Sequence, residues 1–326
     1  MQENVVKQEI EIAGLNHEIQ LGRLLPAIQK GSFAVLDHGL FAGTNFLLNV
    51  FLARWLEPAQ YGAFAVAYSV FLLLGAFHTA VLTEPMMVFG AGKYSATFRS
   101  YLDVLLYGHW GMTGIIALIL ASAAWLVQLQ GPNDFVQALV GLAFASPFIL
   151  LLWLVRRVFY VHGQPHWPAI GGVFHLALML GGMYALYGGQ WLSVGSALAV
   201  MGFASMAVCL WFSTKLHPNR AVESHLKTWG VLADHWDYGK WALATVTLTW
   251  VPSSISYVLL PAWVGLEGSA ALRAVMNLVM PVIQANAAVS SLLLPWFTTT
   301  LKTQQKSCYR IVVLALVLFT AGSVCY

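Results

Sequence analysis

Polar side chains that could bind an ion or an anionic group occur inside the first apolar stretch of the chain. In a helix that turns about 100° per residue, Asp37, His38, Thr44, Asn45 and Asn49 fall within one sector of ~140°. Such a sector faces the interior of a helix bundle or a water-filled cavity rather than lipid. Two interpretations follow: an interhelical hydrogen-bond seam, or a cavity wall in which the Asp37/His38 pair binds a proton or a cation.

A second group of polar side chains occurs near the C-terminus, where Arg273, Asn277 and Gln284 share one face of a helix. Arginine suits phosphate because its planar guanidinium forms two parallel charge-assisted hydrogen bonds, and amides can bond to sugar hydroxyls. This pattern predicts a binding site for a phosphate group that lies next to hydroxyls. The alternative is that Arg273 extends to the membrane surface and has no role in binding.

Four more ionisable residues are candidates. Lys240 lies on a stripe that is expected to contact a bound ligand, and Arg156 with Arg157 ends an apolar stretch where the pair could bind a diphosphate group. A basic pair at that place is also expected from membrane topology alone. Glu84 precedes Pro85, where the helix should be interrupted, and is a candidate for ion coupling together with Asp37 and His38.

Transmembrane helices must position these residues. The chain is 59% hydrophobic and only 9% charged, with a mean hydropathy of +0.72, whereas soluble domains carry about 25% charged residues. We expect an all-α, polytopic membrane helix bundle. A span needs ~20 apolar residues, and the scan predicts eight complete spans and a partial ninth from residue 311, the complete ones being 32–53, 63–89, 104–129, 136–155, 169–187, 193–212, 241–264 and 270–298.

Lysine and arginine alternate between the connections. With the N-terminus in the cytoplasm, fourteen of the sixteen basic residues lie inside, and only Arg54 and Arg273 lie outside, as expected for a plasma (inner) membrane protein. The predicted parts are a cytoplasmic leader, an N-terminal lobe of six helices, a cytoplasmic linker and the start of a C-terminal lobe, at residues 1–31, 32–213, 214–240 and 241–326.

Several function classes find no support in the sequence. The chain contains no nucleotide-binding GxxxxGK[ST], no GxSxG and no HExxH motif. It also lacks a block of basic residues and zinc-type cysteine spacing, so we expect no nucleic-acid partner. We expect no enzymatic activity, no cofactor and no metal site, which leaves ion gradients or mass action as the energy source.

The segment ARWLEPAQYGAFAVAYSVFLLL at 53–74 resembles the "aR.L.p..yG.f" signature of polysaccharide and O-antigen flippases. These belong to the multidrug/oligosaccharidyl-lipid/polysaccharide exporter superfamily. Glu84-Pro85, RRVFYVHGQPHWPA at 156–169 and parts of 239–282 are similar to the same family. The resemblance implies two helix lobes facing a cavity that opens alternately to either side. Family members have more helices than the chain has predicted spans, so we expect a C-terminally truncated fragment.

The resemblance further implies a passive or ion-coupled flippase or exporter that moves a lipid-linked oligosaccharide or polysaccharide unit across the plasma membrane by alternating access. Its implied partners are the lipid-linked glycan, membrane lipids and the polysaccharide polymerase or export machinery. Two alternatives remain open. One is a multidrug/cation antiporter of the same superfamily, and the other is a membrane glycan polymerase or ligase, against which the short outer connections count.

Overall fold

The computed structural model describes residues 2–129, 133–216 and 226–279, and contains no strand in those ranges. The helices are α1 (Gln2–Trp55), α2 (Pro58–His78), the π-helical turn η1 (Thr79–Thr83), α3 (Glu84–Ala91), the 3₁₀ turn η2 (Ser95–Thr97), α4 (Phe98–Gln128), α5 (Asp134–Val161), α6 (His166–Gly188), α7 (Val194–Ser213), α8 (Thr228–Leu259) and α9 (Pro261–Val264). Residues 266–279 are also helical.

In the described part of the chain, six helical segments are long and apolar enough to cross a membrane, and residues 228–264, bent by 58° between Pro252 and Ser254, make a seventh candidate. The predicted all-α membrane bundle and its first six spans are therefore confirmed. The predicted eighth span begins in the helical residues 266–279 and continues outside the described residues, where the partial ninth also lies.

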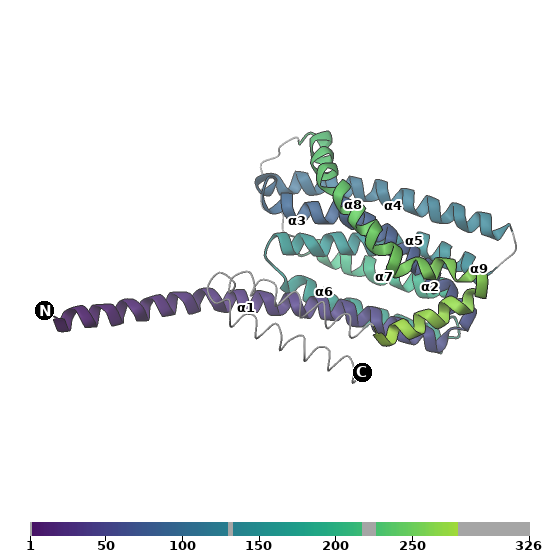
Figure 1. Ribbon diagram of the computed structural model, residues 1–326, viewed down its shortest axis with the longest axis horizontal. Helices are drawn as coiled ribbons and strands as arrows, with labels where there is room; N and C mark the ends of the chain where they lie inside the picture. Colours follow the sequence, from purple (N-terminus) through teal and green to yellow (C-terminus); the bar gives the residue numbers. More distant parts are fainter. Residues whose placement is uncertain (1, 130–132, 217–225, 280–326) are drawn as a thin grey trace.

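Two predicted boundaries do not coincide with helix ends. Helix α1 continues from the leader into the first span without a break near residue 31, and Figure 1 shows its N-terminal part extending beyond the bundle. Helix α8 begins at Thr228, so the last part of the predicted linker 214–240 is helical. In both places a polar sequence continues the helix because helical backbone satisfies its own hydrogen bonds whatever the side chains are.

Local sequence explains where several helices begin. Pro58 opens α2, at a position where its missing N–H is not needed. The Asn133 side chain accepts a hydrogen bond of 2.9 Å from the Val136 amide at the start of α5. Ser193 and Ser196 form a reciprocal capping box at the start of α7.

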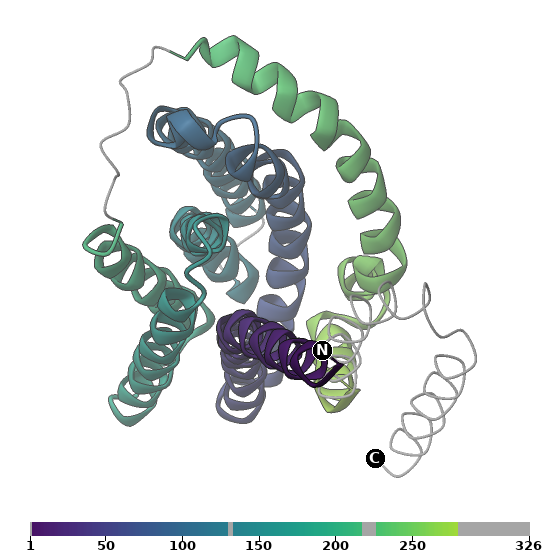
Figure 2. The same ribbon diagram turned by 90° about the vertical axis from the view of Figure 1, so that its left-hand side faces the viewer.

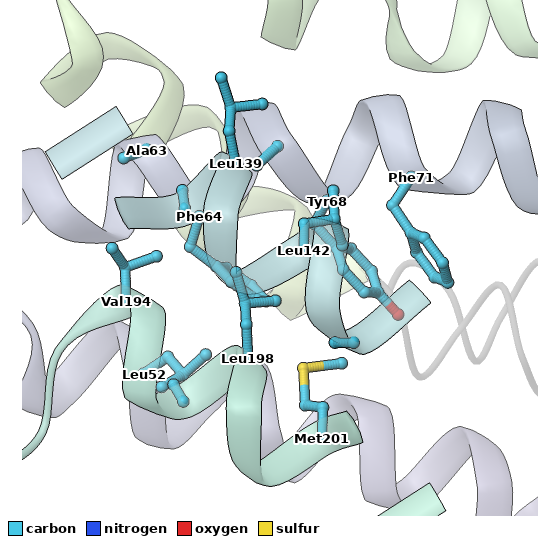
Figure 3. Close-up of a cluster of buried hydrophobic side chains, with 14 of the residues drawn as sticks. Leu52, Ala63, Phe64, Tyr68, Phe71, Leu139, Leu142, Val194, Leu198 and Met201 are labelled. Atoms are coloured by element: carbon cyan, nitrogen blue, oxygen red, sulfur yellow. The ribbon is translucent and has the colours of Figure 1, made fainter. Parts of the chain in front are cut away.

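Helix α5 is central and packs against α2, α4 and α7. Small residues allow the close approach of α7: a Cβ added at Gly141 would lie 3.0 Å from Cβ of Leu198, and one at Gly202 would lie 3.0 Å from Cα of Ala145. Figure 3 shows the core beside this contact, where Phe64 of α2 and Leu142 of α5 are fully buried.

Large apolar side chains also cover the outside of the bundle. On α4, Tyr107, Ile115, Leu118 and Trp125 are each at least 60% exposed. Soluble monomers rarely expose contiguous apolar surface on this scale, whereas a membrane protein presents it to lipid.

The two ends of the bundle differ in charge. The end that carries Lys93, Arg99, Arg156, Arg157 and Lys215 is called the basic end below; α3, α5 and α7 finish there and α4 begins. The other end, where α1 meets α2, is called the distal end. Helix α8 runs from the basic end to the distal end and curves along α2, η1 and α3 (Figure 2).

Candidate functional site

A buried ion pair joins α1 to α5 near the basic end. Arg156 Nη2 donates a hydrogen bond of 2.6 Å to Oδ1 of Asp37, and the Tyr160 hydroxyl donates one of 2.6 Å to Oδ2. Asp37 is fully buried and Arg156 is 9% exposed. Arg156 and Tyr160 lie one turn apart on α5, so both reach the same carboxylate. Asp37, one member of the predicted polar stripe of α1, thus faces the interior, whereas its neighbour His38 is exposed.

A cavity of about 220 Å³ adjoins this pair. Its lining comes from three segments, with Asp37, His38 and Phe41 on α1, Thr79 and Thr83 on η1, and Trp153, Arg156, Arg157 and Tyr160 on α5. Four residues predicted from the sequence therefore meet at one place, although α1 and α5 are far apart in the chain. The structure brings the predicted pair Asp37/His38 together with the predicted pair Arg156/Arg157.

The guanidinium of Arg156 retains unused hydrogen-bonding capacity. It lies over the Phe41 ring, with 4.4 Å between Cζ and the ring centre, and only its Nη2 donates to Asp37. Its Nε is buried and has no hydrogen-bond partner among the described residues. Because arginine carries five N–H donors and a buried unsatisfied donor is unfavourable, this group is able to accept a further anionic partner.

Two amides of α1 form the hydrogen-bond seam that was one of the two interpretations of its polar sector. Asn45 and Asn49 donate to carbonyls of their own helix one turn earlier, Phe41 and Asn45, at 3.0 and 2.8 Å. Their side-chain oxygens face other helices: Oδ1 of Asn45 accepts from the Tyr68 hydroxyl at 3.2 Å. Thr44 donates to the Leu40 carbonyl at 2.7 Å.

The C-terminal described segment contacts the same seam from the other side. Arg273 Nε donates a hydrogen bond of 3.0 Å to Oδ1 of Asn49, and Asn277 Nδ2 donates one of 2.8 Å to the Tyr61 hydroxyl. Arg273 is 6% exposed and lies over the rings of Tyr68 and Tyr257, at 5.1 and 5.7 Å. Arg273 therefore points into the bundle rather than away from it.

Backbones also approach closely at this place. An ideal Cβ added to Gly62 would lie 1.9 Å from the carbonyl oxygen of Leu266. Only glycine fits, because that oxygen belongs to a backbone and cannot swing aside. The residues Asn49, Tyr61, Gly62, Leu266, Arg273 and Asn277 are called the distal contact below.

The π-helical turn η1 ends two residues before Pro85, and this proline changes the hydrogen bonding of the turn. A proline has no N–H, so in a regular helix it leaves the carbonyl four residues earlier, that of Val81, without a partner. Here His235 Nδ1 donates to the Val81 carbonyl at 2.8 Å. Since a carbonyl only accepts, a neutral His235 must accept at Nε2, and the Tyr101 hydroxyl donates there at 2.6 Å.

Asp234, next to His235, ties the start of α8 to the basic end. Lys93 and the Tyr94 hydroxyl each donate a hydrogen bond of 2.5 Å to Oδ2 of Asp234. The hydrogen bond that Lys93 donates to Asp234 raises the pKa of the exposed Lys93 above its ordinary value.

The other predicted residues lie elsewhere. Lys240 is exposed and pairs with Asp237 at 2.8 Å, away from the lining of the cavity. Glu84 is half-buried at the start of α3 and does not line the cavity either. Gln284 lies outside the described residues.

Several polar residues of the site were not predicted from the sequence. Tyr160, Thr79, Thr83 and Trp153 line the cavity, and of these only Tyr160 carried a usable signal, its spacing of one turn from Arg156. The buried pair formed by Nε2 of His78 and Nδ1 of His109, 2.9 Å apart, also escaped notice, because single histidines in apolar runs show no recognisable spacing.

Comparisons with known proteins divide sharply between sequence and structure. No protein-family model and no curated protein matches the sequence. The structure is similar to the inward-facing conformation of a multidrug resistance MATE family transporter of the MOP superfamily, with a TM-score of 0.65 and 14% identity over 86% of this chain and 68% of that one. The outward-facing conformation of a multidrug resistance MATE family transporter of the MOP superfamily gives a TM-score of 0.55 and 12% identity, over 92% and 73% of the two chains.

A third similar structure is a MOP superfamily transporter from Pyrococcus furiosus, described as having a reverse polarity of its binding pocket. It gives a TM-score of 0.57 and 12% identity, over 82% of this chain and 63% of that one. Identities this low bear on the arrangement of the helices alone. The chain is a multi-pass membrane protein with the fold of MOP superfamily transporters.

Proposed function

We propose that the chain belongs to a membrane exporter that moves a lipid-linked oligosaccharide or polysaccharide unit across the plasma membrane by alternating access. Its N-terminus lies in the cytoplasm in this proposal. The cargo binds in the cavity at the basic end, where its phosphate or diphosphate meets Arg156 and Arg157. The MOP transporter fold supports transport in general, and the chemistry of the cavity supports this class of cargo.

The charge of the cavity carries the proposal. Asp37 is neutralised by Arg156 at 2.6 Å, which leaves Arg157 as the excess charge on the lining, and His38 can add to it when protonated. Arg156 moreover holds a buried Nε without a partner in the described part of the chain. A cavity with excess positive charge and free guanidinium donors favours an anion, and phosphate suits arginine through its paired oxygens.

The remaining lining suits the sugar that follows the phosphate. The hydroxyls of Thr79, Thr83 and Tyr160 can exchange hydrogen bonds with sugar hydroxyls. Trp153 adds an aromatic ring against which a sugar can pack. The roles that the sequence assigned to Lys240 and Glu84 receive no support from the lining.

A multidrug/cation antiporter is the second candidate. The likeness to MATE transporters and the carboxylate of Asp37 favour it, because a buried carboxylate can bind a cation. Against it stands the short ion pair with Arg156, since a cationic drug would have to displace a guanidinium while facing Arg157. A membrane glycan polymerase or ligase has no observation in its favour.

In an alternating-access cycle one end is closed while the other is open. The distal contact closes the distal end, so we assign this conformation to the state that is open at the basic end. Arg273 and Asn277 close the distal end against α1 and α2 through buried hydrogen bonds. The higher TM-score with an inward-facing than with an outward-facing transporter agrees with that assignment. Arg273 then stabilises the closed distal end in this state, and its side chain becomes available to cargo when that end opens.

A flipping assay tests the proposal. The chain is reconstituted into liposomes with a fluorescent polyprenyl-diphosphate oligosaccharide, and the label accessible to dithionite is followed over time; export of the cationic dye ethidium is measured in parallel. We expect the lipid to be flipped and Arg157→Gln to weaken its binding about tenfold or more, since a hydrogen bond to a charged group is worth ~1.5–3 kcal/mol.

Arg99→Gln is the matched control, because Arg99 is an exposed arginine at the same end that does not line the cavity. Transport of ethidium but not of the lipid would favour the antiporter. In cells, the proposed partners are the polysaccharide polymerase or export machinery, which crosslinking to the active exporter would identify.

A further inference from the structure

We propose that an anionic headgroup and a proton bind together at this cavity, because the anion competes with Asp37 for Arg156. This inference rests on the proposed function and adds a coupling rule to it. In the unloaded state the Asp37 carboxylate holds Arg156. An anion that takes the guanidinium leaves the carboxylate without its cation, and the carboxylate then takes up one proton.

The geometry places the anion and Asp37 in competition for one guanidinium. Asp37 is fully buried, and its two oxygens are occupied by Arg156 and Tyr160 at 2.6 Å each. Arg156 lines the cavity from one side and touches Asp37 on the other, so an anion in the cavity meets the same guanidinium. The Nε of Arg156 is buried and has no hydrogen-bond partner among the described residues, so the guanidinium has a donor left for a second partner.

Electrostatics then decides the protonation state. Two anions that share one buried guanidinium repel each other at short range in a medium of low dielectric constant. A carboxylate in that situation is neutralised rather than left as an uncompensated buried charge. As the Asp37–Arg156 pair opens, the site takes up one proton from solvent and one anion from solution. The net charge of the site therefore changes by the charge of the anion plus one.

Asp37 differs from the neighbouring groups because it is the group that loses its cation when the pair opens. His38 is exposed to solvent, and η1 supplies only the threonines Thr79 and Thr83. The titratable or charged groups that face the pair are, within the described ranges, His38 from α1, Arg157 and Tyr160 from α5, and His175 from α6, which lies near Arg156. None of these four groups is a carboxylate, whereas Asp37 is a carboxylate and a direct hydrogen-bond partner of Arg156.

The coupling has a definite sign. Because anion binding takes up a proton, binding weakens as the pH rises, by up to tenfold per pH unit when one whole proton is taken up. A low pH on the side of the membrane where the anion is loaded favours binding. A high pH on the side where it is released favours dissociation of the anion and the proton together.

Isothermal titration calorimetry on the detergent-purified chain tests the inference. The probe is methanedisulfonate, a dianion that resembles a diphosphate but does not titrate near neutral pH. Titrations in two buffers of different ionisation enthalpy give the number of protons taken up for each anion bound. We expect close to one proton for the parent chain, and an affinity that falls up to tenfold per pH unit.

Asp37→Asn should bind the anion at least as tightly, with no proton uptake and no pH dependence. Tyr160→Phe keeps the ion pair but removes a donor to the charged carboxylate, so it should shift the pH-dependent range upward. This variant tests the inference even where Asp37→Asn does not fold. Asp103→Asn, at an exposed carboxyl of α4 outside the cavity, should match the parent.

Anion binding by the parent without proton uptake would overturn the inference, as would an unchanged pH dependence in Asp37→Asn. Failure of the folded parent to bind the dianion would also count against the site. A chain that binds the dianion with proton uptake but does not flip the labelled lipid contradicts the proposed function and leaves the coupling intact.

Discussion

Replacing Gly62 by alanine should open the distal contact. The new Cβ would lie 1.9 Å from the Leu266 carbonyl oxygen and 2.5 Å from its carbon, whereas ordinary contacts begin near 3.4 Å, so the two backbones must separate by about 1.5 Å. Overpacking of this kind costs typically ~1–3 kcal/mol. Since ~1.4 kcal/mol changes an equilibrium tenfold, the ratio of open to closed distal ends should rise by about five- to a hundredfold.

Spin labels at the exposed positions Glu57 and Glu267 report this change by pulsed electron resonance. The parent should give one short distance, and Gly62→Ala should add a longer population. Gly114→Ala is the matched control, because a Cβ on this α4 glycine meets no atom within 4 Å. The same distance distribution and melting temperature for parent and Gly62→Ala would refute the reasoning.

The remaining predictions concern the π-helical turn and the topology. His235→Phe removes the donor to the Val81 carbonyl and should destabilise the chain by ~1–3 kcal/mol in thermal unfolding. Adding Pro85→Ala to this variant should recover part of the loss, because an alanine N–H can donate to that carbonyl. Additive effects of the two substitutions would contradict the link between His235 and Pro85. A single cysteine at Gln190 should react with an impermeant reagent from outside the cell and one at Ser95 should not, and the reverse pattern would invert the proposed orientation.

The sequence predicted the polar face of α1 but not its partner. The helical period placed Asp37, Asn45 and Asn49 on one side, and all three lie inside the bundle. Several basic residues at the same end were equally eligible to pair with Asp37. The pairing with Arg156 depends on how α1 is rotated against α5 and α6. Helix packing sets that rotation, and the pairing joins residues that are 119 positions apart in the sequence.

The same limit applies to the C-terminal polar face. Arg273 and Asn277 share a face, as predicted, and both hydrogen bond across to α1 and α2. Which residues they meet follows from the close approach at Gly62, and that approach depends on the neighbouring backbone rather than on any local pattern. Spans and stripes are local properties of the sequence, whereas pairings between helices are not.

The turn η1 joins the cavity to the contact between α8 and the N-terminal helices. Thr79 and Thr83 line the cavity, while the Val81 carbonyl between them accepts from His235 of α8. A shift of α8 must therefore move the turn or break this hydrogen bond. We expect His235→Phe to weaken dianion binding at the cavity in addition to its effect on stability, because the turn loses its support. Asp103→Asn should change neither. Parent-like binding by a folded His235→Phe variant would show that η1 holds its position without α8.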